Sequence, residues 1–216
     1  MSTPPRTRDD RSAQDAPLEA RSAVPPPDTV PAAAARGLLL DDERRPHVRE
    51  MLGYFLSRAT VADFAVRRVR LAALDFRANE LRVGRCRVLL GMLDVDALTE
   101  AAMAGRHDPG RAAALGALRQ LIEDGRLEIR SAGTTRWSPD FAVFEGLPES
   151  GPLPARSVCL IGWLGLDGAG RSGPLLTSVV AGGPAVRAAA ARFEQIWHDG
   201  WDVIGVISAA LRLSAP

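Results

Sequence analysis

Short apolar runs of β type alternate with helical stretches along most of this chain, and this alternation is the feature that most limits its fold. Six runs have the length and the β-branched or aromatic content that are typical of strands. They lie at residues 61–66, 85–91, 126–131, 140–146, 156–163 and 174–182. The first two runs are each followed by a helical stretch, whereas the last four follow one another. This order predicts an α/β fold with a mixed β-sheet flanked by helices.

The helical stretches are marked by apolar residues three or four positions apart and by capping residues at their ends. Asp94 is expected to cap one helix, while Pro109 and Gly125 are expected to bound the next. The C-terminal segment 201–213 is apolar, and we expect it to pack back on the body of the domain. Helices are predicted at residues 41–59, 67–76, 96–105, 109–125 and 184–200.

The N-terminal segment has a different composition, rich in Pro, Ala, Ser, Arg and Asp and without a hydrophobic period. Such a segment cannot bury enough apolar surface to offset its chain entropy. We expect residues 1–36 to form a disordered tail, with a short helix beginning near 32–40, and residues 37–216 to form a single domain. No secretory signal is visible and no apolar run reaches the roughly 18 residues of a membrane span. The expected location is therefore cytoplasmic, without membrane contact.

All 27 basic side chains are arginines, and the chain contains no lysine. GC-rich coding is the simplest cause, but the chemical consequence holds in any case. Arginine does not lose its proton at ordinary pH, so Schiff-base chemistry, a P-loop and any lysine-dependent phosphodiester chemistry are excluded. Cys86 and Cys159 lie in apolar runs and the three histidines are scattered. Neither a metal site nor a cofactor is expected.

The second half of the chain resembles the phospholipase D-like superfamily. The segments that carry the resemblance are GRLEIRSAGTTRWSPDFAVFEG, RSVCLIG, PLLTSVVAG and RFEQIWHDGWDV, and the similarity extends over about residues 48–204. The resemblance implies a succession of four strands and a helix with an aromatic-rich end. It also implies a His-x-Lys motif, in which the histidine attacks phosphorus to form a phosphohistidine and the lysine holds the phosphate oxygens.

This chain departs from that pattern at every position that carries the chemistry. Ser138 stands where the nucleophilic histidine belongs, and Asp140 stands where the phosphate-binding lysine belongs. A serine hydroxyl without a neighbouring base is a weak nucleophile, and a carboxylate repels phosphate. Trp163 and Gly165 occupy positions where small polar residues would contact the phosphate. The resemblance therefore implies a degenerate, phospholipase D-like single domain without catalytic residues.

Ligand binding could survive beside such a degenerate site. Arg130, Arg136 and Trp137 would flank it, and arginines with aromatic rings can bind phosphates and stack on bases. Alternatively, Arg126 and Arg130 lie on a solvated strand face while the tryptophans fill the core. The leading hypothesis is a catalytically inactive binding or scaffolding subunit in a bacterial nucleic-acid transaction such as repair or phage defence.

Two other functions stay open at this point. One is a phosphodiesterase or nuclease that uses unconventional residues, for example Asp140 together with Glu145 or Glu128. The alternation of side chains along a strand would separate Asp140 from Glu145, which weakens this hypothesis. The other is a protein–protein interaction module that binds through its apolar C-terminus. A protein partner or a homodimer is expected in the leading hypothesis, and the sequence supports nucleic-acid binding more weakly.

Overall fold

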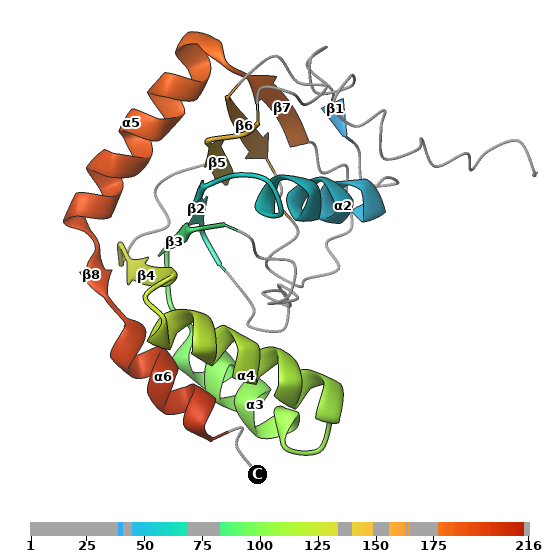
Figure 1. Cartoon of the computed structure of the whole chain (residues 1–216). Helices are drawn as coiled ribbons and strands as arrows, with labels where there is room; N and C mark the ends of the chain where they lie inside the picture. Colours follow the sequence, from blue (N-terminus) through green and yellow to red (C-terminus); the bar gives the residue numbers. More distant parts are fainter. Residues whose placement is uncertain are drawn as a thin grey trace, which may run out of the picture.

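A computed structural model of the chain describes residues 39–40, 45–68, 83–133, 140–148, 156–162, 164 and 177–213. An eight-stranded sheet with the order β1-β7-β6-β5-β2-β3-β4-β8 forms its centre (Figure 1). All six strands that the sequence predicts are present, as β2 to β7. The strands are β1 (Leu39–Leu40), β2 (Val61–Val66), β3 (Arg85–Leu90), β4 (Leu127–Ser131), β5 (Phe141–Glu145), β6 (Ser157–Gly162), β7 (Thr177–Ala181) and β8 (Trp201–Asp202).

The sheet is mixed, as predicted from the order of helical and strand-like segments. Strands β2, β3 and β4 are parallel, while β5, β6 and β7 continue from β2 as antiparallel neighbours. Antiparallel neighbours can follow each other directly, whereas parallel neighbours need a longer crossover. The prediction of a short helix near residues 32–40 is wrong for Leu39 and Leu40. These two residues form the strand β1, which pairs with β7.

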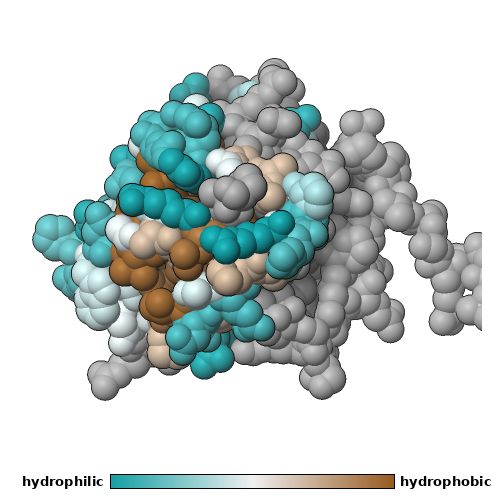
Figure 2. All heavy atoms as spheres, turned by 90° about the horizontal axis from the view of Figure 1, so that it is seen from below, coloured by the Kyte–Doolittle hydropathy of each residue, from teal (hydrophilic) through white to brown (hydrophobic). Residues whose placement is uncertain are grey.

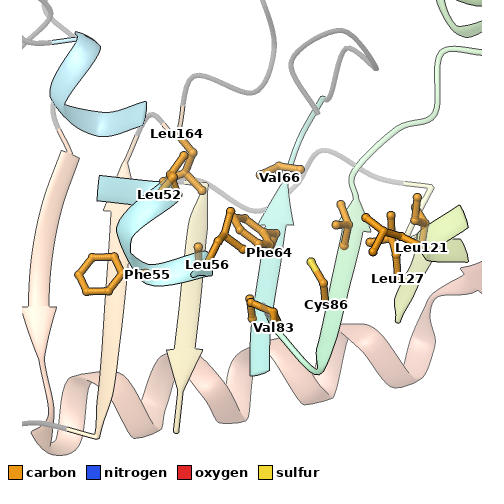
Figure 3. Close-up of a cluster of buried hydrophobic side chains, with 14 of the residues drawn as sticks. Leu52, Phe55, Leu56, Phe64, Val66, Val83, Cys86, Leu121, Leu127 and Leu164 are labelled. Carbon is orange, nitrogen blue, oxygen red and sulfur yellow. The ribbon is translucent and has the colours of Figure 1, made fainter. Parts of the chain in front are cut away.

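Helices cover both faces of this single α/β domain. Helix α5 lies along one face, where it contacts β2, β5, β6 and β7, and the other helices pack on the opposite side (Figures 1 and 3). A long crossover through α3 and α4 joins the parallel strands β3 and β4. The helices are α2 (Arg45–Leu56), α3 (Val95–Gly105), α4 (Pro109–Glu123), α5 (Gly183–Asp199) and α6 (Ile204–Arg212).

The two faces of the sheet have separate hydrophobic cores, and alternate residues of β2, β3, β5, β6 and β7 belong to one or the other. Phe64 of β2 and Phe55 of α2 belong to the larger core (Figure 3). Phe144 of β5 belongs to the same core and contacts the Phe64 ring. The rings of Phe55 and Phe144 stack with their centroids 5.1 Å apart. Ala65 faces the smaller core beneath α5, which includes Phe193. Burial on both faces explains why the strands read as continuous apolar runs.

Several element boundaries follow the predicted signals. The Asp94 carboxylate accepts a hydrogen bond of 3.0 Å from the Ala97 amide and so caps α3. Helix α4 begins at Pro109, and Gly125 follows its end with a left-handed φ of 68°. The helix predicted at 67–76 lies outside the described residues except for Arg67 and Arg68, which are not helical.

The C-terminal segment packs back on the domain, as predicted. Helix α6 contacts α3, α4 and β4, and its Ile207 and Leu211 are buried in the larger core. Within the described part of the chain, no helix has both the length and the hydrophobicity needed to cross a membrane.

Candidate functional site

The strand ends to which the resemblance assigns phosphate-binding and catalytic positions lie together at one edge of the sheet. Strand β2 ends at this edge, β5 begins there and β6 ends beside it, because Ala65 pairs with Phe141 and Phe141 with Ile161. The Gly162 amide donates a 2.8 Å hydrogen bond to the Asp140 carbonyl. We call the residues that follow β2, precede β5 and end β6 the polar edge; they are Arg67, Asp140 and Gly162.

Asp140 forms an ion pair with Arg67 at the polar edge. One carboxylate oxygen, Oδ1, accepts hydrogen bonds from the Arg67 backbone amide at 3.1 Å and from its Nε at 3.0 Å. The Asp140 side chain is 12% exposed, so the pair is largely shielded on its acidic side. Asp140 was expected to repel a phosphate, but its charge is compensated by Arg67. Sequence reasoning missed this partner because Arg67 begins the run RRVR, which was interpreted as the start of a helix.

Arg136, Trp137, Ser138, Trp163 and Gly165, which the sequence also assigns to the site or its surroundings, lie outside the described residues. Their assignments stay predictions.

Arg130 is described, and it contacts α5. Its Nη1 donates a 3.0 Å hydrogen bond to the Trp197 carbonyl, and its guanidinium lies 4.7 Å from the centre of the Trp197 ring. The strand order places β4 three strands from β5, which corresponds to about 14 Å between Arg130 and Asp140. Arg126, at the start of β4, donates to the Val83 carbonyl at 2.8 Å. Both arginines therefore make contacts that stabilise the fold.

A buried ionic network lies between the sheet and α5. Asp63 and Arg87 are register partners on β2 and β3 and are 4% and 6% exposed. Arg87 Nε and Nη2 each donate a 2.7 Å hydrogen bond to one oxygen of the Asp63 carboxylate. The same guanidinium also donates to Glu194 of α5, from Nη2 at 2.5 Å and from Nη1 at 3.2 Å. We call these three residues the Arg87 network.

The Arg87 network keeps all three of its groups in their charged forms. Burial by itself would lower the pKa of Arg87, but its hydrogen bonds to Asp63 and Glu194 outweigh burial and raise that pKa above its ordinary value. The hydrogen bond from Arg87 also holds the pKa of the Glu194 carboxyl below its ordinary value. The guanidinium lies 4.9 Å from the centre of the Phe193 ring, which adds a cation–π contact.

Sequence reasoning missed the Arg87 network, although a signal was present. Asp63 and Arg87 each interrupt an otherwise apolar strand run, and two opposite charges in such runs indicate a buried pair. The two strands had first to be neighbours for the pair to form, and only the tertiary structure shows that they are.

Among the described residues, neither the cysteine thiols nor the histidines lie in an environment that would activate them for catalysis. Cys86 and Cys159 are buried, as predicted, and burial raises the pKa of each thiol to about 12. His107 and His198 are exposed. Within the described ranges, no group of three or more His, Cys, Asp or Glu side chains could hold a metal ion.

The carboxylates of the unconventional-enzyme hypothesis are far apart. Asp140 and Glu145 stand at opposite ends of β5, which corresponds to about 16 Å along an extended strand. Glu128 lies on β4, three strands away from β5. These positions do not form the close carboxylate pair that a shared metal or proton would need.

Comparisons with known proteins add little to this picture. No family model matches the chain, and no curated protein matches it. Among solved structures, the chain is similar to TrmBL2, an archaeal chromatin protein reported to show a novel mode of DNA binding, with 10% sequence identity and a TM-score of 0.45. The match covers 76% of this chain and 54% of that one, so the chain spans about half the length of this neighbour.

Proposed function

We propose that this chain is a phospholipase D-like domain without phosphodiesterase chemistry, and that it acts as a binding or scaffolding subunit. The succession of β4, β5, β6, β7 and α5 supports this proposal, because it has the element order that the resemblance implies. The aromatic pair Phe193 and Trp197 in the last turns of α5 also matches the aromatic-rich helix end of that superfamily.

The observation that carries the proposal is the ion pair between Asp140 and Arg67 at the polar edge. A phosphodiesterase of the resembled kind needs a net positive charge there to hold the phosphate oxygens. Asp140 supplies a negative charge instead, and Arg67 is engaged in neutralising it. The pair has no net charge, so it gives the polar edge no electrostatic attraction for a phosphodiester.

Three other charged groups on the central strands make contacts within the fold. Asp63 and Arg87 neutralise each other in the interior, and Arg130 is engaged with Trp197. A domain whose strand charges are used in this way is suited to presenting surfaces rather than to catalysis. The setting that we propose is a bacterial nucleic-acid transaction such as repair or phage defence, which rests on the resemblance alone.

The test is a phosphodiesterase assay on single-stranded DNA, duplex DNA and bis-p-nitrophenyl phosphate, with and without divalent cations. We expect no turnover above buffer with the full chain. Turnover that disappears in Ser138→Ala or Asp140→Ala but persists in Glu123→Gln, on the exposed surface of α4, would overturn the proposal in favour of an enzyme.

A nucleic-acid contact has its own measurement. Fluorescence anisotropy with a labelled oligonucleotide at low salt reports binding directly. If Arg136 and Trp137 make the contact, Arg136→Ala lowers the dependence of binding on salt, because each phosphate contact contributes about −0.7 to the log–log slope on single strands. Trp137→Phe then weakens binding without changing that slope. Absence of binding at micromolar protein would leave protein scaffolding as the function.

A further inference from the structure

The large hydrophobic side chains that are exposed in the described residues lie on α3 and α6 or next to the ends of these helices. Their exposed fractions range from 38% to 57%. Figure 2 shows apolar atoms gathered on the underside of the molecule, where α3 and α6 lie in Figure 1. We call this surface the α3–α6 face; its exposed apolar residues are Met92, Val95, Met103, Trp201, Val206 and Leu213.

The α3–α6 face is built from two helices that run in the same direction. Arg106, at the end of α3, donates a 2.5 Å hydrogen bond from Nε to the Leu213 carbonyl at the end of α6, so the two carboxyl ends meet. Val95 and Met103 are eight residues apart on α3, and Val206 and Leu213 are seven apart on α6. Such spacings place apolar residues along one stripe of each helix. The helices therefore present an apolar strip about two turns long.

Charges are distributed unevenly along the α3–α6 face. Its amino end carries three exposed carboxylates, and its carboxyl end carries two exposed guanidinium groups and one exposed carboxylate. The carboxylates at the amino end belong to Asp94, Asp96 and Asp202, while the guanidinium groups at the carboxyl end belong to Arg106 and Arg212 and the carboxylate there to Asp108. The face thus has a net negative charge at one end and a net positive charge at the other, with the exposed apolar side chains and Glu100 between them.

We propose that the α3–α6 face is the contact between two copies of this chain, related by a two-fold axis perpendicular to α3 and α6. A two-fold contact uses the same surface on both subunits, so the surface must complement itself. An axis through the middle of the strip sets the acidic end of each copy against the basic end of the other. It also sets α3 antiparallel to its symmetry mate, so that opposite helix-dipole ends meet.

Other occupants fit the charges less well. A uniformly basic partner would meet repulsion from Arg106 and Arg212, and a uniformly acidic partner or an anionic membrane would meet repulsion from the carboxylates at the amino end. A second copy complements both ends at once. The inference goes beyond the proposed function, since a subunit without phosphodiesterase activity could equally be a monomer.

The first experiment measures the molecular mass of the full chain as a function of concentration by sedimentation equilibrium. We expect twice the monomer mass at tens of micromolar, with dissociation favoured by salt because the contact includes opposite charges. A monomer at 100 µM and low salt would overturn the inference. Phosphodiesterase assays are independent of this result, so the two proposals can fail separately.

Substitutions on the α3–α6 face locate the contact. Met103→Arg places a charge in the apolar strip and should raise the dimer dissociation constant about tenfold or more. Ala188→Arg is the matched control, because Ala188 is exposed on α5, on the opposite side of the sheet. Circular dichroism and a melting curve verify that both variants fold. Equal weakening by both variants, or none by Met103→Arg, would show that the dimer uses another surface.

Charge reversal tests the two-fold arrangement itself. Asp96→Arg or Arg106→Glu alone should weaken association, because these residues lie at opposite ends of α3 and each change creates a like-charged contact with the antiparallel α3 of the second copy. The double variant restores opposite charges at both ends and should regain most of the wild-type affinity. Additive weakening in the double variant would exclude the proposed orientation.

Cross-linking offers a readout that does not depend on affinity. Both native thiols are buried, so Met103→Cys introduces an accessible thiol that the native cysteines do not compete with. A bifunctional maleimide should link Met103→Cys into a covalent dimer and leave Ala188→Cys monomeric. The opposite result would place the contact on α5 and overturn the inference.

Discussion

Asp63 and Arg87 face each other on adjacent parallel strands and join through two hydrogen bonds of 2.7 Å in the interior of the domain. The pair lies beneath α5, and Glu194 of that helix completes it from the more exposed side. A buried charge is tolerated only when it is paired and hydrogen-bonded. The Arg87 network therefore ties α5 to the parallel part of the sheet and makes that contact dependent on charge.

Removal of one member of the buried pair should destabilise the domain strongly. Arg87→Met leaves the Asp63 carboxylate in the interior without its cation, and we expect a loss of about 3–5 kcal/mol in the free energy of unfolding. Urea denaturation followed by circular dichroism measures this loss. The double variant Asp63→Leu with Arg87→Met removes both charges and should be considerably more stable than Arg87→Met alone.

The matched control for Arg87→Met is Arg119→Met. Arg119 pairs with Glu123 at 2.7 Å on the exposed surface of α4, where both side chains are about half exposed. Exposed pairs of this kind contribute about 0.3–0.5 kcal/mol. If Arg119→Met lowered the free energy of unfolding as much as Arg87→Met does, burial would not increase the cost of removing an ion-pair partner.

Glu194 should make stability depend on pH. Its pKa is lower in the folded chain than in the unfolded chain, so its contribution is present above the unfolded value of about 4.3 and is lost as the pH falls through the folded value. Glu194→Gln removes this contribution. The difference in unfolding free energy between wild type and Glu194→Gln should therefore be larger at pH 7 than at pH 3. A difference that grows toward acid would reverse the sign and contradict the assigned ion pair.

Alanine substitutions at two exposed glycines should change the stability of the domain in opposite directions. Gly146 has a left-handed φ of 69°, and a Cβ built there would lie 2.0 Å from the Thr60 hydroxyl oxygen. We expect Gly146→Ala to cost about 1–3 kcal/mol. Gly116 lies within α4 with nothing within 4 Å of a built Cβ, so Gly116→Ala should stabilise by about 0.5–1 kcal/mol. Melting midpoints of the two variants test both expectations. A higher midpoint for Gly146→Ala would contradict the left-handed backbone conformation at Gly146.

Residues 1–36 are predicted to be dispensable for folding. Their composition offers no packing face, so their deletion should leave the melting midpoint unchanged within error. The deletion retains Leu39 and Leu40, which pair with β7. A further deletion through Leu40 is the control and should lower the midpoint. A loss of several degrees on removing 1–36 alone would mean that the tail docks on the domain.

Most of the secondary structure could be predicted because its signals are local. The strand runs appear as β2 to β7, Asp94 caps α3 and Pro109 begins α4, as expected from capping rules that act within one helical turn. The short β1 was not predicted, since two residues carry no periodicity and Leu39 and Leu40 are held by their pairing with β7.

The candidate site could be predicted only in part. Asp140 was identified at the start of β5, but its neutralisation by Arg67 was not, because the two residues are 73 positions apart. The resemblance placed Arg130 beside the same degenerate site as Asp140. In the sheet, β2 and β3 lie between β4 and β5 and separate the two residues.

The sequence by itself predicted the strands β2 to β7 and the helices α2 to α5, and the burial of both cysteines, and it shows that the chain contains no lysine. Hydrophobic periodicity, capping and composition act within a few residues, so they can be recognised without knowledge of the fold. Only the tertiary structure decided the strand order, the partner of Asp140 and the network in which Arg87 contacts Asp63 and Glu194. Those contacts join residues 24 to 107 positions apart. They form only when burial of the apolar faces brings distant segments together.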